Sequence, residues 1–354
     1  MTEPDFQESL RALFGSPLPP FQVEKLLGDA STRRYYRIAV EASDVRPRSV
    51  VVMQLPDDAF GSDEGGTQVK SDRLPFLEVG DLLRERGIRV PDVHVEALDR
   101  GQIILEDLGQ MTFGDQLGGV ARSDWSRPYA EAIDLLATMH ERCGDLPSAS
   151  IVARRRFDRE LLTWELEHFR EWGLEALFGP LDARSASGVT EAFSEIVEAM
   201  MAMPYGFVHR DFQSRNLMVS NEGAITVIDF QDALMGPRAY DLVALLCDSY
   251  VTLDADIQES MIRRYAAARR VDASAILEEF WLVTLHRKLK DAGRFVFIDR
   301  ERNNAGFLQW YPQSLAYVGR ALTRLERFAG LEGVLRSEIP GFPDSIEKPP
   351  SKVE

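Results

Sequence analysis

The sequence predicts an α+β protein that has a small β-rich N-terminal lobe and a larger, mainly helical C-terminal lobe. Strand-type segments dominate residues 1–107, whereas apolar residues recur at helical spacing through most of residues 108–339. One short β-rich stretch interrupts the helical part and carries a dense group of polar residues. Residues 340–354 are rich in proline and charge, so we expect a disordered tail there.

The composition narrows the range of possible partners. The 354 residues include 41 Lys and Arg against 57 Asp and Glu, which gives a formal net charge of −16. A nucleic-acid binder usually has the opposite sign, and an acidic surface disfavours docking on anionic membranes. The acidic start and the absence of long apolar runs predict neither a signal peptide nor a membrane-spanning helix. The only cysteines, Cys143 and Cys247, form no metal or disulfide motif, so we expect a cytoplasmic protein. We also expect a monomer.

The N-terminal part reads as strands with one helix among them. Residues 74–87 have apolar side chains at helical spacing, and Gly87 ends this helix. The polar, glycine-rich residues 57–72 predict a mobile loop. A turn at Asp99–Gly101 joins the last two strands. The predicted strands are 21–28, 33–40, 49–56, 93–99 and 101–109.

After Gly109 the pattern becomes helical, with one exception. Apolar faces at helical spacing predict helices at 129–142, 155–169 and 189–203, and several more follow them. The exception comprises three short strand-type segments, FVHRD, NLMVS and AITVIDF. A hairpin turn at Asn221–Gly223 joins the last two, so we expect their polar residues in a cleft between the lobes.

Three polar side chains of this stretch have the chemistry of a phosphoryl-transfer site. Asn216 follows Asp211 by five residues, and the hairpin returns the chain so that Asp229 should lie near Asn216. A carboxylate together with an amide oxygen suits Mg²⁺, which takes few protein ligands plus the phosphates of a substrate. Asp211 then remains to orient and deprotonate an acceptor hydroxyl.

The motif around these residues resembles that of kinases. HRDFQSRN at 209–216 fits the catalytic-loop pattern H-R-D-x-x-x-x-N, and IDF at 228–230 stands where the metal-binding D-F-G is expected. Residues 20–330 resemble the aminoglycoside phosphotransferase family of small-molecule kinases. This resemblance implies a protein-kinase-like bilobal fold, in which the lobe at 1–107 binds ATP and the lobe at 108–339 carries the catalytic and substrate residues.

The resemblance also implies roles for single residues. Asp211 is the expected catalytic base, and Asn216 and Asp229 are the expected Mg²⁺ ligands. Residues 103–109 are the expected hinge, in which the backbone of two residues would hydrogen-bond the adenine ring. The hinge contacts are Glu106 and Leu108, the supporting residues of the catalytic loop are His209, Arg210 and Asp241, and the possible substrate contacts are Gln213 and Arg215.

The N-terminal lobe departs from the usual kinase pattern. It has no G-x-G-x-x-G loop, and Met53 and Gln54 stand where the third strand of a kinase carries a lysine that pairs with a helix residue such as Glu78. One interpretation is a nucleotide-binding pseudokinase. The other assigns the phosphates to the segment GDASTRRYYR, whose small residues and arginines can approach phosphate oxygens closely. The expected nucleotide contacts in this segment are Gly28, Ser31, Thr32, Arg33 and Arg34.

The same segment narrows the resemblance. The patterns G-D-A-S-x-R-R-Y-x-R and HRDFQSRNLM, together with the missing third-strand lysine, are similar to those of bacterial anomeric N-acetylmuramate/N-acetylglucosamine kinases of cell-wall recycling. This similarity implies Mg²⁺-dependent transfer from ATP to the anomeric hydroxyl of an amino sugar. Residues 285–318 fit the pattern less closely, which leaves the acceptor open. An aminoglycoside phosphotransferase and a pseudokinase remain the alternatives.

Overall fold

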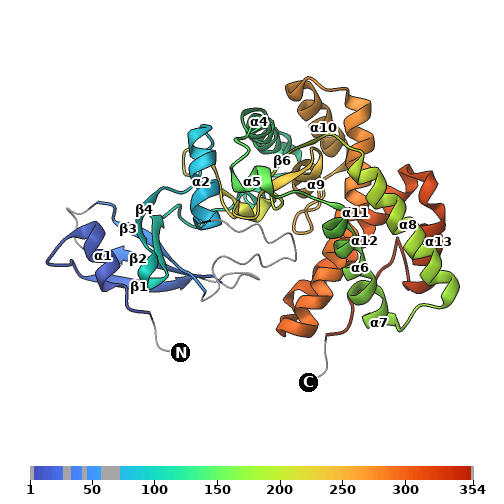
Figure 1. The fold of residues 1–354 in the computed structure, drawn as a ribbon, viewed down its shortest axis with the longest axis horizontal. Helices are drawn as coiled ribbons and strands as arrows, with labels where there is room; N and C mark the ends of the chain where they lie inside the picture. The colour runs from blue at the N-terminus through green and yellow to red at the C-terminus, as the bar shows by residue number, and fades with distance from the viewer. Residues whose placement is uncertain (1–3, 27–32, 42–45, 57–71, 352–354) are drawn as a thin grey trace.

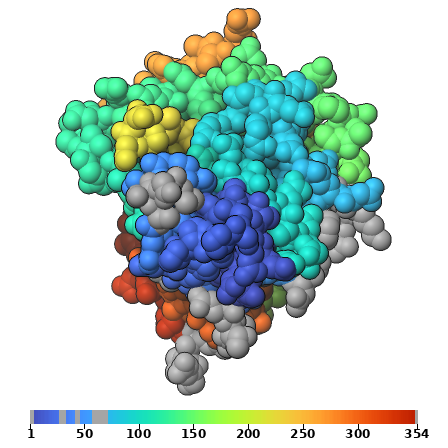
Figure 2. Space-filling view, turned by 90° about the vertical axis from the view of Figure 1, so that its left-hand side faces the viewer, coloured from blue at the N-terminus to red at the C-terminus, as the bar shows by residue number. Residues whose placement is uncertain are grey.

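The computed structural model describes residues 4–26, 33–41, 46–56 and 72–351, and it confirms the predicted α+β class. A sheet lobe lies at one end of the molecule and a helical lobe at the other (Figure 1). Viewed from the sheet end, the first helix and the N-terminal strands stand in front of the helical lobe (Figure 2). Within the described ranges no helix is long and apolar enough to cross a membrane. The expected mobile loop at 57–72 lies outside those ranges, apart from its last residue.

The N-terminal lobe is an antiparallel sheet of five strands with a helix on each face. On one face, Phe6 and Leu10 of the N-terminal segment pack with Val52. On the other face, Met53 and Leu77 are both buried in the main core. The elements are α1 (Gln7–Phe14), β1 (Phe21–Leu26), β2 (Arg34–Val40), β3 (Ser49–Gln54), α2 (Pro75–Glu85), β4 (Val93–Ala97), the 3₁₀ turn η1 (Leu98–Arg100) and β5 (Gln102–Glu106), and the sheet order is β1-β2-β3-β5-β4.

The first helices of the C-terminal lobe follow the predicted pattern with shifted boundaries. The expected helix at 129–142 begins at Ser126, and the one expected at 189–203 spans Ala183–Met201. The expected helix at 155–169 begins only at Arg159, because the Asp158 side chain caps it by accepting a hydrogen bond from Leu161 N at 2.9 Å. A π-helical segment continues it. These elements are α3 (Phe113–Gly118), η2 (Arg122–Asp124), α4 (Ser126–Arg142), α5 (Ile151–Arg154), α6 (Arg159–His168), the π-helix η3 (Phe169–Glu175), α7 (Ala176–Phe178) and α8 (Ala183–Met201).

The second half of this lobe is arranged around one long helix. That helix, α11, spans 30 residues and is buried over most of its length, since it contacts η3, α6, α9, α10 and α12. The helical elements here are α9 (Tyr240–Leu246), α10 (Ala255–Arg269), α11 (Ala273–Arg302), η5 (Ala305–Trp310), α12 (Tyr311–Arg324), η6 (Glu326–Phe328) and α13 (Ala329–Glu338).

Two short sheets carry the polar stretch, where the sequence predicted a single strand pair. β7 (Leu217–Val219) pairs with β8 (Ile225–Val227) as expected, but β6 (Tyr205–Val208) pairs with a further strand, β9 (Leu234–Pro237). Glycine and proline are poor strand residues, which hid β9 from the sequence pattern. The glycine of β9 is required by packing, because a Cβ atom at Gly236 would lie 2.6 Å from the Phe157 ring.

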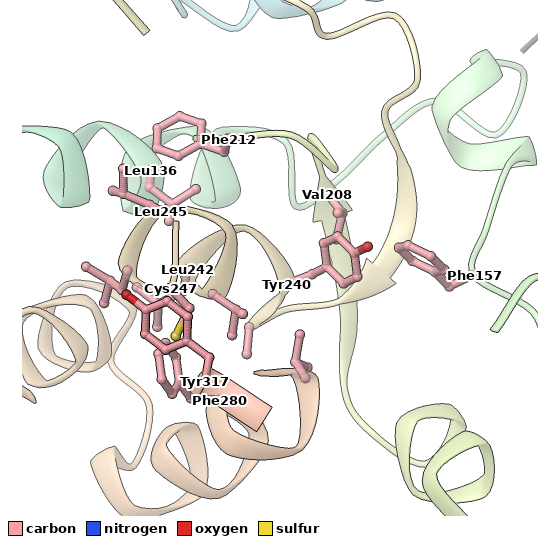
Figure 3. Close-up of a cluster of buried hydrophobic side chains, with 14 of the residues drawn as sticks. Leu136, Phe157, Val208, Phe212, Tyr240, Leu242, Leu245, Cys247, Phe280 and Tyr317 are labelled. Atoms are coloured by element: carbon pink, nitrogen blue, oxygen red, sulfur yellow. The ribbon is translucent and has the colours of Figure 1, made fainter. Parts of the chain in front are cut away.

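Aromatic side chains anchor the polar stretch in the core of the helical lobe (Figure 3). Phe212, in the middle of HRDFQSRN, is fully buried near Leu136 and Leu245. The rings of Tyr240 and Phe157 lie 4.7 Å apart below the end of β6. The apolar residue within the motif therefore holds the polar residues on either side of it in place.

The described part of the segment after α13, for which the composition predicts disorder, makes several contacts with the helical lobe. Residues 340–351 lie against the helical lobe, where Phe342 is 6% exposed and Pro343 contacts the position of Gly319 in α12. Arg300 Nη2 also donates a hydrogen bond to Pro350 O at 3.0 Å. Phe342 and Pro343 supply the apolar surface of these contacts.

Candidate active site

Asp241 holds the loop between β6 and η4 (Ser214–Asn216) by its backbone. Its Oδ2 accepts a hydrogen bond from His209 N at 2.7 Å, and its Oδ1 accepts one from Arg210 N at 3.0 Å. The Asp241 carboxylate is completely buried, and His140 Nε2 lies 3.0 Å from its Oδ2. His140 Nδ1 lies 2.7 Å from Tyr265 Oη, so the brace continues into α10. A supporting role for Asp241 stays a prediction, which these contacts favour.

His209 supports the same loop from inside. Its Nδ1 accepts a hydrogen bond from Asp211 N at 3.2 Å, so its Nε2 carries the proton and donates to Ile228 O at 3.1 Å. The imidazole therefore joins the candidate base to the residue that precedes Asp229. A supporting role for His209, as expected from the sequence, agrees with these contacts.

Two residues of the site have backbone angles that are unusual for residues with a Cβ atom. Arg210 has φ of 77° and Asp229 has φ of 65°. Such angles cost about 1–3 kcal/mol each and persist only where the surrounding structure holds them. Arg210 is held by a buried hydrogen bond from its Nη2 to Glu165 Oε1 at 3.2 Å and by Asp241. Among the described residues, Arg270 and Asn303 also have positive φ, but they end helices, whereas Arg210 and Asp229 lie in the loops that carry the candidate base and metal ligand.

Asn216 and Asp229 are brought together as the hairpin predicted. Asn216 Nδ2 donates to Asp229 Oδ2 at 3.3 Å and to Asp211 O at 2.9 Å, and Gln231 Nε2 donates to Asp229 Oδ1 at 2.9 Å. Burial and then the negative charge of Asp211 raise the pKa of Asp229 above its usual range. A cation bound here would therefore stabilise the ionised carboxylate of Asp229.

The pair fits Mg²⁺ rather than a metal held by protein alone. Asn216 uses its amide nitrogen on Asp211 and Asp229, so its carbonyl oxygen is the atom left for a metal. Across the part of the chain that the structure describes, there is no group of three or more His, Cys, Asp or Glu side chains that could form a complete metal cage. Mg²⁺ needs only one or two such ligands when phosphate oxygens and water supply the others.

The helix α2 packs on the residue that follows Asp229. The rings of Phe76 and Phe230 are stacked with centroids 5.1 Å apart, and a Cβ atom at Gly80 would lie 3.2 Å from the Phe230 ring. Glu78 Oε1 accepts a hydrogen bond from Ile151 N at 2.6 Å, which ties α2 to the C-terminal lobe. In the kinase pattern, a helix glutamate such as Glu78 pairs with a lysine of the third strand. Here Glu78 accepts a hydrogen bond from a backbone amide, and Met53, which stands where that lysine is expected, is buried.

Arg37, which sequence reasoning did not assign, holds the hinge. Its Nε and Nη2 donate to the Asp107 carboxylate at 2.9 and 3.2 Å, and its Nη2 also donates to Gly109 O at 2.9 Å. Although burial alone would raise the pKa of Asp107, the hydrogen bonds from Arg37 and from Gly109 N hold it below its usual value. The sequence did contain a signal for Arg37, because it is the last arginine of the segment GDASTRRYYR.

The structure places the expected nucleotide contacts only in part. Gly28, Ser31 and Thr32 lie outside the described residues, while Arg33 and Arg34 are half-buried at the start of β2. In the hinge, the Glu106 amide donates to Asp92 O at 2.8 Å, and the Glu106 carboxylate accepts from Arg89 Nη2. A contact between Glu106 and an adenine ring would therefore use its carbonyl oxygen, with Leu108 as the second expected position.

Arg215 and Gln213, the possible substrate contacts, are both half-buried. The Arg215 guanidinium lies 3.7 Å from the Tyr250 ring centroid and 6.0 Å from that of Trp310. This platform is tied to the catalytic loop, because Asp248 accepts hydrogen bonds from Ser214 N at 2.8 Å and Tyr250 N at 2.9 Å. A guanidinium in the loop that also carries Asp211 suits a polar acceptor.

The two lobes and their arrangement are those of protein-kinase-like small-molecule kinases. A choline kinase from Streptococcus pneumoniae matches 93% of this chain and 98% of its own with a TM-score of 0.59 and 18% identity. A spectinomycin phosphotransferase, solved with ADP and spectinomycin, matches 92% of both chains with a TM-score of 0.54 and 16% identity. At these identities the likeness shows a shared fold.

The sequence pattern described as the phosphotransferase enzyme family matches residues 22–280, and the chain belongs to that family. It is therefore a phosphotransferase. A curated relative from Pseudomonas putida is 30% identical over 321 residues, 88% of this chain and 86% of the relative. One from Pseudomonas aeruginosa is 29% identical over 330 residues, 90% of this chain and 89% of the relative. Both relatives are named N-acetylmuramate/N-acetylglucosamine kinase.

Proposed function

We propose that this phosphotransferase transfers the γ-phosphoryl group of ATP, with Mg²⁺, to the anomeric hydroxyl of N-acetylmuramate and N-acetylglucosamine. The observation that carries the proposal is the position of Asp211 beside the Asn216–Asp229 pair, on a loop held by Asp241. The names of the curated relatives supply the acceptor. Arg215, whose guanidinium lies over the Tyr250 ring, supports a polar acceptor such as a sugar, since a guanidinium offers several hydrogen-bond donors.

Each residue has a definite task in this reaction. Asn216 and Asp229 would hold Mg²⁺, which neutralises charge on the triphosphate of ATP. Asp211 orients the acceptor hydroxyl and takes its proton as the oxygen bonds to the γ-phosphorus and the bond from that phosphorus to ADP breaks. His209 and Asp241 keep Asp211 in position through the backbone. Catalysis then consists mainly of positioning and charge neutralisation.

A sugar panel tests the reaction and the position phosphorylated. Purified protein is supplied with ATP, Mg²⁺ and each sugar, ADP release is followed, and the product is identified by phosphorus NMR. N-acetylmuramate and N-acetylglucosamine should each give a sugar 1-phosphate. The methyl glycoside of N-acetylglucosamine is the matched control, because it differs only in lacking a free anomeric hydroxyl, and it should give no product.

Other outcomes separate the alternatives. Transfer to the methyl glycoside would place the reaction at another hydroxyl, and transfer to an aminoglycoside but to neither sugar would favour an antibiotic phosphotransferase. Asp211→Asn should lower transfer about 10²–10⁴-fold, the usual contribution of a general base, while Mg²⁺-dependent ATP binding is retained. ATP binding without transfer to any acceptor by the unaltered protein would favour the pseudokinase.

A further inference from the structure

Arg287, in the middle of α11, is a buried cation beside the candidate base. Its side chain is only 3% exposed, and its guanidinium lies 4.9 Å from the Tyr240 ring centroid. It is 76 residues from Asp211 in the sequence, and its role is not predicted by the HRDFQSRN motif. Since a buried charge is costly without partners, the groups that Arg287 contacts show what its position achieves.

The guanidinium binds the catalytic loop at two points. Arg287 Nη2 donates to Asp211 Oδ1 at 3.1 Å, and Arg287 Nη1 donates to Arg210 O at 2.7 Å. One contact fixes the carboxylate of the candidate base, and the other fixes the carbonyl of the residue whose φ is 77°. The planar guanidinium makes both contacts in a rigid geometry that a lysine ammonium cannot reproduce.

Asp211 is the closer of the two carboxylates that compensate the buried charge of Arg287. Asp291, on the same helix, places its Oδ2 4.0 Å from Arg287 Nε, but that oxygen accepts a hydrogen bond from Lys288 Nζ at 2.8 Å, and Tyr240 lies under the guanidinium. The Asp211 side chain is 28% exposed, so water could also solvate it. The ion pair between Arg287 and Asp211 therefore costs Asp211 some of its freedom to rotate, and that restraint is what a positioned base requires.

We propose that Arg287 is the positioning residue of Asp211: it occupies Oδ1 and so presents Oδ2 to the acceptor hydroxyl. The proton of the acceptor then moves to Oδ2. In the same way, Arg287 holds the strained backbone of Arg210 through its carbonyl. The inference rests on the proposed function, because it takes Asp211 to be the base. In this proposal, a residue of α11 orients the base, although the base itself lies in the loop after β6.

A double-mutant cycle tests this inference with the full-length protein. Arg287→Met keeps the length of the side chain and removes its donors. It should lower kcat about 10²-fold, the usual cost of a misplaced reacting group, with little change in KM for ATP. In the Asp211→Asn background the same change should lower the residual kcat by no more than about threefold, because the group that Arg287 positions is already absent.

Two further variants distinguish a loss of positioning from a loss of stability if Arg287→Met is unstable. Arg287→Lys keeps the buried charge and should recover only part of kcat, since one ammonium cannot serve both contacts. Arg238→Met is the matched control. It also removes an arginine bound to α11, through hydrogen bonds to Glu279 at 2.9 and 2.7 Å, and should lower stability while leaving kcat near that of the unaltered protein.

The outcomes separate this inference from the proposed function. Equal losses of kcat for Arg287→Met in both backgrounds would show that Arg287 acts only on the fold, and so would full recovery of kcat by Arg287→Lys. A rise in KM for the sugar at unchanged kcat would instead assign Arg287 to acceptor binding, and would overturn the inference. If the unaltered protein transfers no phosphoryl group to either sugar, the proposed function fails first.

Discussion

Asp241 and His209 show how few side chains are needed to hold a catalytic loop. A single buried carboxylate accepts hydrogen bonds from two consecutive amides of that loop, at 2.7 and 3.0 Å. An imidazole then connects the loop to the end of β8. Because these contacts go to the backbone, they do not engage the Asp211 carboxylate.

At the residue scale, Asp229 should control the metal requirement. Asp229→Asn removes the only negative charge of the Asn216–Asp229 pair, so the Mg²⁺ concentration for half-maximal activity should rise and kcat should fall about 10²-fold or more. The measurement is a Mg²⁺ titration of activity at saturating ATP and sugar. The control is Asp134→Asn, whose exposed ion pair with Arg264 lies outside the site. An unchanged Mg²⁺ requirement in Asp229→Asn would exclude Asp229 as a metal ligand.

At the element scale, α11, the helix that carries Arg287, approaches η3 closely at Gly293. A Cβ atom at Gly293 would lie 2.7 Å from Phe169 Cα and 2.9 Å from His168 O. Both are backbone atoms, so neither can move aside by a change of rotamer. The small residue in the middle of α11 therefore sets the distance between this helix and its neighbour.

Two glycine substitutions in helices should have opposite effects on stability. Alanine gains up to about 1 kcal/mol over glycine in a helix, but forcing an atom into a packed core costs about 1–3 kcal/mol. Gly293→Ala should therefore lower the free energy of unfolding, while Gly333→Ala in α13, where a Cβ atom meets nothing within 4 Å, should raise it. Denaturant unfolding of both variants measures this. An equal gain in both would mean that α11 and η3 are not packed this closely.

At the scale of the whole molecule, the two lobes are joined by contacts from both sides of the hinge. Arg37 of β2 holds Asp107 and Gly109, and Glu78 of α2 accepts from Ile151 N in the helical lobe. Such contacts limit the movement of one lobe relative to the other. We therefore expect the two sides of the nucleotide site between the lobes to keep a nearly fixed relative position.

Binding of the nucleotide should stabilise the protein in a metal-dependent way. A ligand that binds only the folded state contributes about 2.7 kcal/mol at 100 times its Kd. ATP with Mg²⁺ should therefore raise the Tm by several degrees, and ATP with a chelator should raise it much less, since Asn216 and Asp229 would lack the cation they share with the phosphates. Differential scanning fluorimetry measures both shifts. Equal shifts with and without Mg²⁺ would argue against a metal bound at that pair.

The fold class, the hairpin of β7 and β8, and the three polar residues near that hairpin could all be predicted from the amino-acid sequence. These follow from local patterns, because strand alternation, turn residues and a spacing of five residues depend only on neighbours along the chain. The relation of Asp211, Asn216 and Asp229 could be predicted because all three lie within one hairpin and its approach.

The contacts between residues that are distant in the sequence could be found only from the tertiary structure. Arg287 is 76 residues from Asp211, and Arg37 is 70 residues from Asp107, so no local pattern connects them. The same holds for β9, whose glycine and proline contradict strand propensity and whose place is set by the Phe157 ring. A buried ion pair or a close backbone contact is a property of packing, and packing depends on the whole fold rather than on any segment of it.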